Sequence, residues 1–312
     1  MSSSVPLQSI VAPILQSMIG SATIITLLGF ILYGITVAQA YSYAVNTEED
    51  AKWIKVLVVL VMLSETCFSA FVLDSLYELT TIDLTDFLDV DLLTWNISFA
   101  LLPELVLVVM VQGFYTHRLW HLSDNSVVVT AGVGLMVVIR AAFKFVTFSY
   151  EYRSHTWTAF SEDPVALWTA EAAHIISAVT DTLIAITLLY YLSRRKSGVA
   201  RFVFIQFVPI PIGTSYYNRT DNVVNWVMIY AVNTGTITML LSISTAVTFI
   251  VLKNNMTFVG LATILCRSYA NSFLGTLNAR RRLRSHLGET VELGRRSIEV
   301  TAEKDLSDRL EQ

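Results

Sequence analysis

The stretch Phe258–Arg284 reads FVGLATILCRSYANSFLGTLNARRRLR, a mostly apolar run that ends in a cluster of arginines. About 20 apolar residues in a helix cross the hydrocarbon core of a bilayer. The backbone must be helical there, because lipid offers no hydrogen-bond partners to its N–H and C=O groups. The sequence of this stretch therefore predicts a membrane-spanning helix that is followed at once by cations at the membrane surface.

Six further stretches of the chain have the same character. The predicted spans are Val11–Ala38, Ile54–Tyr77, Ile97–Tyr115, Val127–Phe148, Ala166–Leu192, Val223–Leu252 and Phe258–Leu277. The sequence thus predicts an all-α, polytopic membrane protein with seven transmembrane helices in one bundle. We expect a membrane domain at residues 1–284 and a charged cytosolic tail at residues 285–312, where no apolar face is sustained.

The composition agrees with this class. Hydrophobic residues make up 54% of the chain and charged residues 15%, whereas an ordinary soluble domain has about 25% charged residues. The mean hydropathy is +0.58, and the net charge of -4 gives no indication of nucleic-acid binding. The two cysteines, Cys67 and Cys266, lie inside predicted spans, so we expect neither an external disulfide nor a metal site.

The distribution of Lys and Arg sets the expected orientation. The connection at residues 78–95 is acidic and has no Lys or Arg, whereas cations follow the fifth and seventh spans. These cations are Arg194, Arg195, Lys196, Arg280, Arg281, Arg282 and Arg284. Because cytoplasmic loops are enriched in Lys and Arg, we expect the N-terminus outside and the C-terminus in the cytosol. The cations then lie where anionic lipid headgroups can bind them.

Ionisable residues inside the predicted spans are candidate functional groups, since each costs about 2.5–3.5 kcal/mol at mid-span on insertion scales. Helical spacing places Glu65 and Asp74 on opposite sides of the second span. Several other acids and bases share the expected outer half and nearly balance in charge, which predicts a polar cavity open to the outside. The candidate ligand-binding residues are Glu104, Arg140, Lys144, Glu171, His174, Asp181, Arg267 and Asn271.

Two interpretations of these residues remain open. They line a ligand or ion site, or they form structural ion pairs that hold the helices in register without any ligand. In either case Arg140 needs an acid on a neighbouring helix, because an unpaired guanidinium at that depth is costly. We expect Glu104 or Glu171 as its partner, since both share the outer half of the membrane with it.

The motifs of named chemistry are absent. Neither H-E-x-x-H nor G-x-S-x-G occurs, so we expect no enzyme, no cofactor and no metal. The seventh span has no lysine to form a retinal Schiff base. We favour a receptor-like sensor with an outward-facing polar cavity. A small-solute or ion transporter is the alternative, because ionisable residues occur on several spans.

The last span resembles the closing signature of a known family. Residues Arg267–Arg280, RSYANSFLGTLNAR, are similar to the approximate pattern Tyr-x-Asn-Ser-Leu-Leu-x-x-Leu-Asn-Ala-Arg of a large family of basidiomycete fungal multipass proteins. Further similarity occurs at Tyr33-Gly34 with residues 39–41, at Val111–Tyr115, and at Asp181 with Tyr190–Leu192. The family has no known function. The resemblance implies seven helices, a fungal source and membrane residence, but no activity.

One segment departs from that family pattern. Val199–Asn218 reads VARFVFIQFVPIPIGTSYYN and is an insertion in the predicted cytosolic loop. It is too short for an eighth span and is interrupted by Pro209 and Pro211. Our hypothesis is a retained intron, and the alternative is an interfacial loop. The sequence of the mature transcript distinguishes the two, since a segment present throughout the message is no intron.

We predict that a cysteine placed at Ser297 is labelled only from the cytosolic side of the membrane. The reason is the asymmetry of Lys and Arg between the two sets of connections. The measurement is impermeant maleimide labelling of intact and of permeabilised cells, in a variant that lacks Cys67 and Cys266. Labelling of intact cells from outside would reverse the topology.

Overall fold

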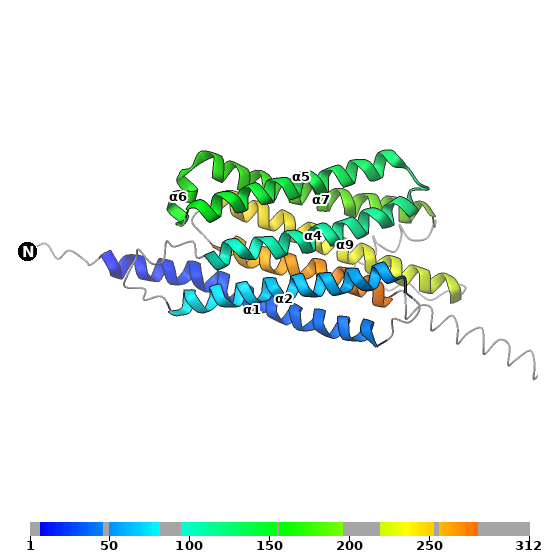
Figure 1. Cartoon of the computed structure of the whole chain (residues 1–312), viewed down its shortest axis with the longest axis horizontal. Coiled ribbons are helices and arrows are strands. Elements are labelled where there is room, and N and C mark those ends of the chain that lie inside the picture. Colours follow the sequence, from blue (N-terminus) through cyan, green and yellow to red (C-terminus); the bar gives the residue numbers. More distant parts are fainter. Residues whose placement is uncertain are drawn as a thin grey trace, which may run out of the picture.

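A computed structural model of the chain describes residues 7–45, 50–81, 95–154, 156–195, 219–252 and 256–279. Side chains are described at residues 20–45, 50–78, 96–154, 156–191, 235–252 and 256–279. The helices are α1 (Leu7–Ala44), α2 (Lys52–Thr81), α4 (Trp95–Leu122), α5 (Val127–Ser154), α6 (Trp157–Glu162), α7 (Pro164–Arg195), α9 (Arg219–Val251) and a C-terminal helix at residues 257–279 (Figure 1). The described part of the chain is thus helical, as the sequence predicts.

Each predicted apolar stretch lies mainly within one of these helices, and several helices extend beyond it. α5, for example, continues from Phe148 to Ser154. The extension has a physical reason, because a helix satisfies its own backbone hydrogen bonds and need not end where the apolar residues end. It also adds Glu151 to the inside of the bundle, which the predicted span did not include.

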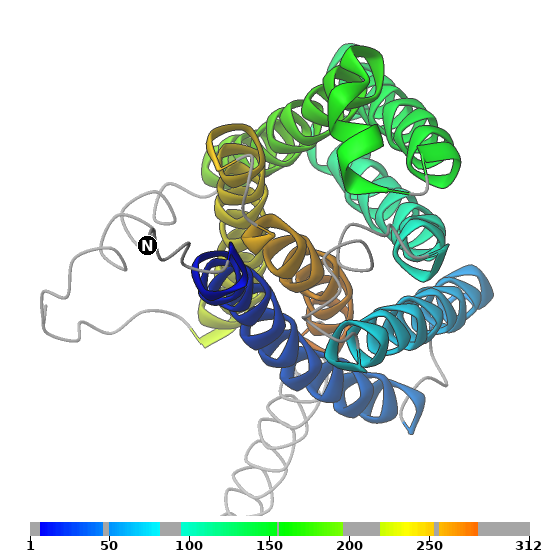
Figure 2. The ribbon, with the colours of Figure 1, turned by 90° about the vertical axis from the view of Figure 1, so that its left-hand side faces the viewer.

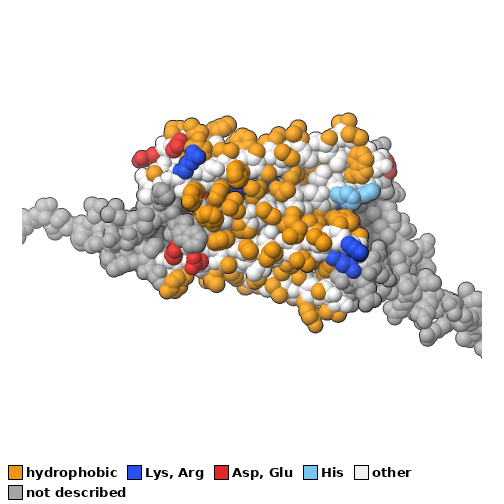
Figure 3. All heavy atoms as spheres, in the orientation of Figure 1, with side chains coloured by type: hydrophobic (Ala, Val, Ile, Leu, Met, Phe, Trp, Pro, Cys, Tyr) orange, Lys and Arg blue, Asp and Glu red, His pale blue; other side chains and the backbone are white. Residues whose placement is uncertain are grey.

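Five of the described helices contain a stretch that is long and apolar enough to cross a membrane. These stretches are Gly20–Ala44, Lys52–Glu78, Asn96–Leu122, Val127–Ser154 and Pro164–Tyr191. The described side chains of α9 form a shorter apolar segment, Gly235–Val251. Large hydrophobic side chains face outward along the middle of the bundle, whereas charged ones lie toward its two ends (Figure 3). The protein is therefore membrane-embedded, and the full set of seven spans stays a prediction.

The C-terminal helix occupies the middle of the bundle. Viewed from the end that holds α6, the other long helices stand around it (Figure 2). Neighbours along the chain pack side by side, with contacts between α2 and α4, α4 and α5, α5 and α7, and α7 and α9. Nearly every residue from 265 to 277 is buried. This helix is absent from the five apolar stretches because it carries polar residues that the surrounding helices cover.

Two local caps set the end of the bundle at α6. Thr156 begins α6, and its Oγ1 accepts a hydrogen bond of 3.1 Å from the Ala159 N–H. Asp163 then caps α7, with Oδ1 accepting bonds of 2.8 and 3.3 Å from the N–H groups of Val165 and Ala166. Pro164 at the first position of α7 has no N–H to leave unpaired. Helix α6 was not predicted, since six residues are too few for a periodic apolar pattern.

Some of the sequence-based predictions concern regions outside the described residues. The tail at residues 285–312 and the insertion at residues 199–218 belong to this group. So do the side chains of the basic clusters that we expect at anionic lipid headgroups, at residues 194–196 and 280–284. The orientation of the bundle and these lipid contacts stay predictions.

The C-terminal helix comes very close to α1 at Gly260. A Cβ atom at this position would lie 2.7 Å from Cβ of Ile25 and 3.1 Å from the carbonyl oxygen of Ala22. Small residues allow such close contact between helices in membranes, where packing rather than the hydrophobic effect drives association. Gly260 therefore fixes how deeply the C-terminal helix sits against α1.

We predict that Gly260→Ala lowers the free energy of unfolding by about 1–3 kcal/mol, because the added methyl group forces the two helices apart. Gly34→Ala on α1 is the matched control, since a Cβ there meets no atom within 4 Å. It should be neutral or stabilising by up to about 1 kcal/mol, through its better helix propensity. Both are measured by unfolding of the purified protein in detergent. Equal effects of the two changes would contradict the close contact.

Candidate functional site

A cavity of about 200 Å³ lies inside the bundle, in the half that holds α6. All the described helices contribute to its wall. On α4 the lining residues Ile97, Ala100, Leu101 and Glu104 follow the three- and four-residue spacing of one helix face. Most of the wall is apolar, so the few charged groups in it determine which molecules it can hold.

The charged part of the wall consists of Glu104, Lys144 and Glu151. Lys144 Nζ lies 3.3 Å from Glu104 Oε1, an ion pair that joins α5 to α4. Glu151, two turns further along α5, lines the same cavity. Within the described part of the chain Glu151 has no hydrogen bond or ion pair. Among the described residues, the wall thus holds one carboxyl group in an ion pair and one, Glu151, that Lys144 attracts without direct contact.

The aromatic part of the wall lies on α6, α7, α9 and the C-terminal helix. The His174 ring centroid lies 4.7 Å from that of Phe249. Phe258 lies 4.8 Å from Phe249 and 5.8 Å from Trp157, centroid to centroid. All four rings line the cavity. His174 is therefore held by ring packing, and no acid among the described residues forms a hydrogen bond or ion pair with it.

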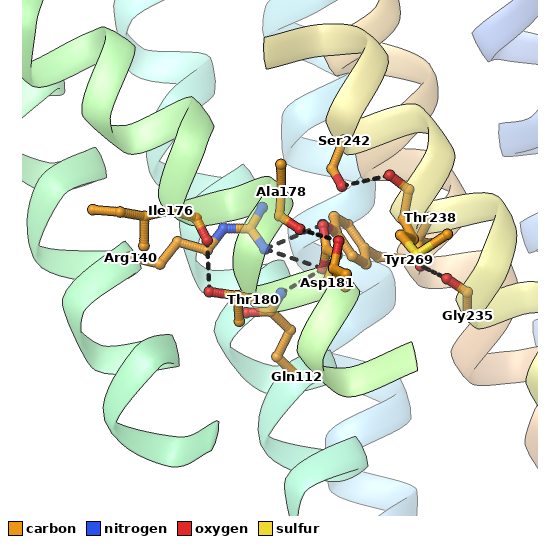
Figure 4. Close-up of polar contacts among 12 residues, drawn as sticks. Gln112, Arg140, Ile176, Ala178, Thr180, Asp181, Gly235, Thr238, Ser242 and Tyr269 are labelled. Carbon is orange, nitrogen blue, oxygen red and sulfur yellow. Dashed lines mark hydrogen bonds and ion pairs between the residues drawn. The ribbon is translucent and has the colours of Figure 1, made fainter. Parts of the chain in front are cut away.

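On the side of the cavity that faces away from α6, a buried polar cluster joins four helices around Asp181 (Figure 4). Arg140 Nη1 on α5 lies 3.6 Å from Asp181 Oδ1 on α7. Gln112 on α4 donates a hydrogen bond of 2.8 Å to the same oxygen. Tyr269 on the C-terminal helix donates its hydroxyl hydrogen to Asp181 Oδ2 and accepts a bond of 3.1 Å from Arg140. Each of the four side chains thus touches at least one partner from another helix.

The expected partner of Arg140 was wrong. We expected Glu104 or Glu171, but Glu104 pairs with Lys144 and Asp181 pairs with Arg140. The reason is the direction of the side chains on α5. Arg140 and Lys144 are one turn apart, so Lys144 reaches the acid nearer the cavity and Arg140 reaches the deeper one. Glu171 is not part of the cavity wall.

A second buried cation lies between α2 and the C-terminal helix. Arg267 is fully buried, and its Nη1 lies 3.2 Å from Glu65 Oε1 and 2.8 Å from Ser69 Oγ. Its guanidinium carbon lies 4.5 Å from the ring centroid of Phe30. Gly29 leaves room for this arrangement, because a Cβ there would come within 3.1 Å of Arg267 Nε. Arg267 therefore binds α1 and α2 to the C-terminal helix, at a place outside the cavity wall.

Two asparagines of the C-terminal helix also bind this helix to α1. Asn271 Nδ2 donates a hydrogen bond of 3.0 Å to the carbonyl oxygen of Leu32 on α1. Asn278 Nδ2 donates a hydrogen bond of 2.9 Å to the carbonyl oxygen of Gln39, which is also on α1. Interhelical bonds from amides to backbone oxygens are a known means of helix association in membranes. Asn271 is thus a helix contact in this structure, and not a wall residue of the cavity.

The structure divides the eight predicted site residues among several places. Glu104, Lys144 and His174 line the cavity. Arg140 and Asp181 belong to the Asp181 cluster, while Arg267 and Asn271 bind neighbouring helices. Glu171 is partly buried on α7 and lies outside the cavity wall. The prediction that Glu65 and Asp74 face opposite ways is confirmed, since Glu65 is fully buried and Asp74 is exposed.

Sequence reasoning missed Gln112, Tyr269 and Glu151. Gln112 and Tyr269 carry no formal charge, so a search for ionisable residues passed over them, although both belong to the segments that resemble the fungal family. Glu151 lay beyond the predicted end of its span. Its spacing of seven from Lys144 was a signal that could have found it, because residues seven apart share a helix face.

Comparison with known proteins adds one finding about the C-terminal part of the chain. Residues 177–282 contain a domain that matches a family of unknown function, DUF6534. This segment holds Asp181 and Tyr269, and therefore the centre of the buried cluster. No curated protein and no solved structure matches the chain. Within the described residues, no group of three or more His, Cys, Asp or Glu side chains is placed to hold a metal ion.

We predict that Arg140→Met lowers the free energy of unfolding in detergent by about 3–5 kcal/mol, because it leaves the Asp181 carboxylate buried without its cation. Adding Asp181→Asn should restore part of this loss. Glu104→Gln is the matched control, since Glu104 pairs with Lys144. In the Arg140→Met background, Glu104→Gln should restore none of the lost free energy of unfolding. Equal recovery with both second changes would contradict the assigned pair.

Proposed function

We propose that the protein is a membrane sensor whose cavity beside α6 binds a small ligand. The observation that carries this proposal is the cavity of about 200 Å³, walled by every described helix and containing charged groups. An engineered apolar cavity of about 150 Å³ binds benzene. The volume is therefore sufficient for a compact molecule that has a ring-sized apolar body and one polar end.

The path from the cavity to the C-terminal helix favours sensing. Lys144 lines the cavity, and Arg140 lies one turn away on the same helix and contacts Tyr269. A ligand that alters the Glu104–Lys144 pair thus acts on a helix whose next turn is bound to the centre of the bundle. Met256, Phe258, Val259, Ala262 and Thr263 also line the cavity, so a ligand contacts the C-terminal region directly.

A transporter is less favoured, because the lining of the cavity is confined to one half of the bundle. Beneath it lie the buried cluster at Asp181 and the fully buried side chains of Leu107, Phe273 and Leu274. A solute would need to displace these packed groups to cross. Of the ionisable residues that suggested transport, Glu65, Arg140, Lys144, Asp181 and Arg267 form ion pairs within the bundle.

The resemblance to basidiomycete fungal proteins enters as part of the proposal. We take the chain to be a seven-span member of that group, with the N-terminus outside and the cavity on the outer side. The DUF6534 match at residues 177–282 supports a relation over the last part of the chain. The acidic connection at residues 78–95 and the arginines that follow the last helix support the orientation.

The test uses three probes of one shape: cyclohexylmethylamine, cyclohexylmethanol and cyclohexanecarboxylate. We predict that at least one raises the unfolding temperature of the purified protein, since a ligand at a hundred times its Kd stabilises by about 2.7 kcal/mol. Ala173→Trp should abolish the shift, because Ala173 is buried in the wall of the cavity. Ala131→Trp is the control, since Ala131 is exposed on α5.

Sensing itself is measured on protein in liposomes. The bound probe should change the labelling rate of a cysteine placed at Ser297, without carrying the probe across the membrane. If the probe crosses the liposome membrane and Ala173→Trp abolishes this flux, the protein is a transporter and not a sensor. Absence of any thermal shift with all three probes would remove the cavity as a binding site.

A further inference from the structure

We propose that the cavity recognises a protonated organic amine with a compact apolar body, anchored by the Glu151 carboxylate and enclosed by aromatic rings. The inference rests on the proposed binding function of the cavity and adds the chemical class of the ligand. It is carried by the charges in the wall, by the placement of the rings, and by the volume.

Among the described residues, the wall has two carboxyl groups and one lysine. The titratable groups that line it are Glu104, Lys144, Glu151 and His174. Lys144 is already bound to Glu104, at 3.3 and 3.4 Å from its two oxygens. Glu151 has no hydrogen bond or ion pair to any described residue. Glu151 is partly buried, and a carboxylate with reduced access to water is costly unless a cation or hydrogen-bond donor meets it, so a cationic ligand would complete this site.

The rings provide the second element of amine recognition. Trp157, Phe249 and Phe258 lie together in the wall, and Phe68 lines it from α2. Aromatic faces attract ammonium groups through their quadrupole, and Trp does so best. His174 stands among them, packed on Phe249. The same rings supply an apolar surface for the body of the ligand, so one wall serves both parts of the molecule.

An anionic ligand fits these observations less well. The lining residues include one cation, Lys144, and an anion would have to break its pair with Glu104. Arg140 lies deeper and is bound by Asp181 and Tyr269. An anion would also face the repulsion of Glu151. A neutral ligand avoids that repulsion but leaves the carboxyl group uncompensated.

The cavity also limits the size of the amine. At about 200 Å³ it exceeds the engineered cavity of about 150 Å³ that binds benzene. A six-membered ring with one methylene and an amine is therefore a suitable probe. Such a primary alkyl amine resembles the lysine side chain, whose pKa of about 10.4 keeps it protonated at pH 7.

The experiment compares the affinities of the three cyclohexyl probes for the purified protein, measured by Trp fluorescence or calorimetry in detergent. The signal of protein-free micelles at the same detergent concentration is subtracted to remove partitioning into detergent. We expect the amine to bind at least about tenfold more tightly than the alcohol, and the carboxylate most weakly, in line with a hydrogen bond to a charged group. This charge selectivity in the unaltered protein tests the proposal without any variant having to fold.

Glu151→Gln then identifies the anchor. It keeps the shape of the side chain and removes its charge, so the preference for the amine over the alcohol should fall to about one. Glu162→Gln is the matched control, since Glu162 is exposed on α6 at the same end of the bundle. It should leave the preference unchanged.

The possible failures are distinguishable. Equal binding of all three probes, or tightest binding of the carboxylate, would overturn the amine assignment and leave the binding function intact. An amine preference that survives Glu151→Gln would overturn Glu151 as the anchor. No binding of any probe would overturn both the ligand class and the proposed function.

Discussion

The burial of a polar helix at the centre of the bundle is the constraint on which the rest of this structure depends. The C-terminal helix carries Arg267 and Asn271 one turn apart on one face and Tyr269 on another, and lipid could satisfy none of them. Each therefore meets a partner on a surrounding helix: Glu65 on α2, Asp181 on α7 and a carbonyl oxygen of α1. The outer helices are in this way positioned by what the central helix requires, and their own outward faces remain free to be apolar.

The ion pairs follow from the same constraint and are arranged by depth. Glu104–Lys144 borders the cavity, and Asp181–Arg140 lies one turn below it on the face of α5. Insertion of each charge costs about 2.5–3.5 kcal/mol on biological scales, and removal of one partner from a buried pair costs about 3–5 kcal/mol. Bonds from Gln112 and Tyr269 reduce the cost for Asp181 further. Such a pair specifies which helices become neighbours, because any other packing leaves a buried charge without its partner.

The sequence predicts the helices well, since lipid makes apolar length and helical structure nearly equivalent. It also separates Glu65 from Asp74, because helical periodicity alone decides that the two face opposite sides. It does not predict which acid meets Arg140. That choice depends on the rotation and depth of two helices relative to each other, and Glu104, Glu171 and Asp181 all satisfy the sequence-level condition of being on a neighbour. The roles of Gln112 and Tyr269 are likewise invisible until the helices are in place.

The cavity exists partly because several side chains in its wall are small. Ala22, Ala100, Ala170, Ala173 and Ala262 all line it, and a larger apolar residue at any of them would fill part of the space. A ligand of the class proposed above would occupy the space that these alanines leave and would place its ammonium group beside Glu151.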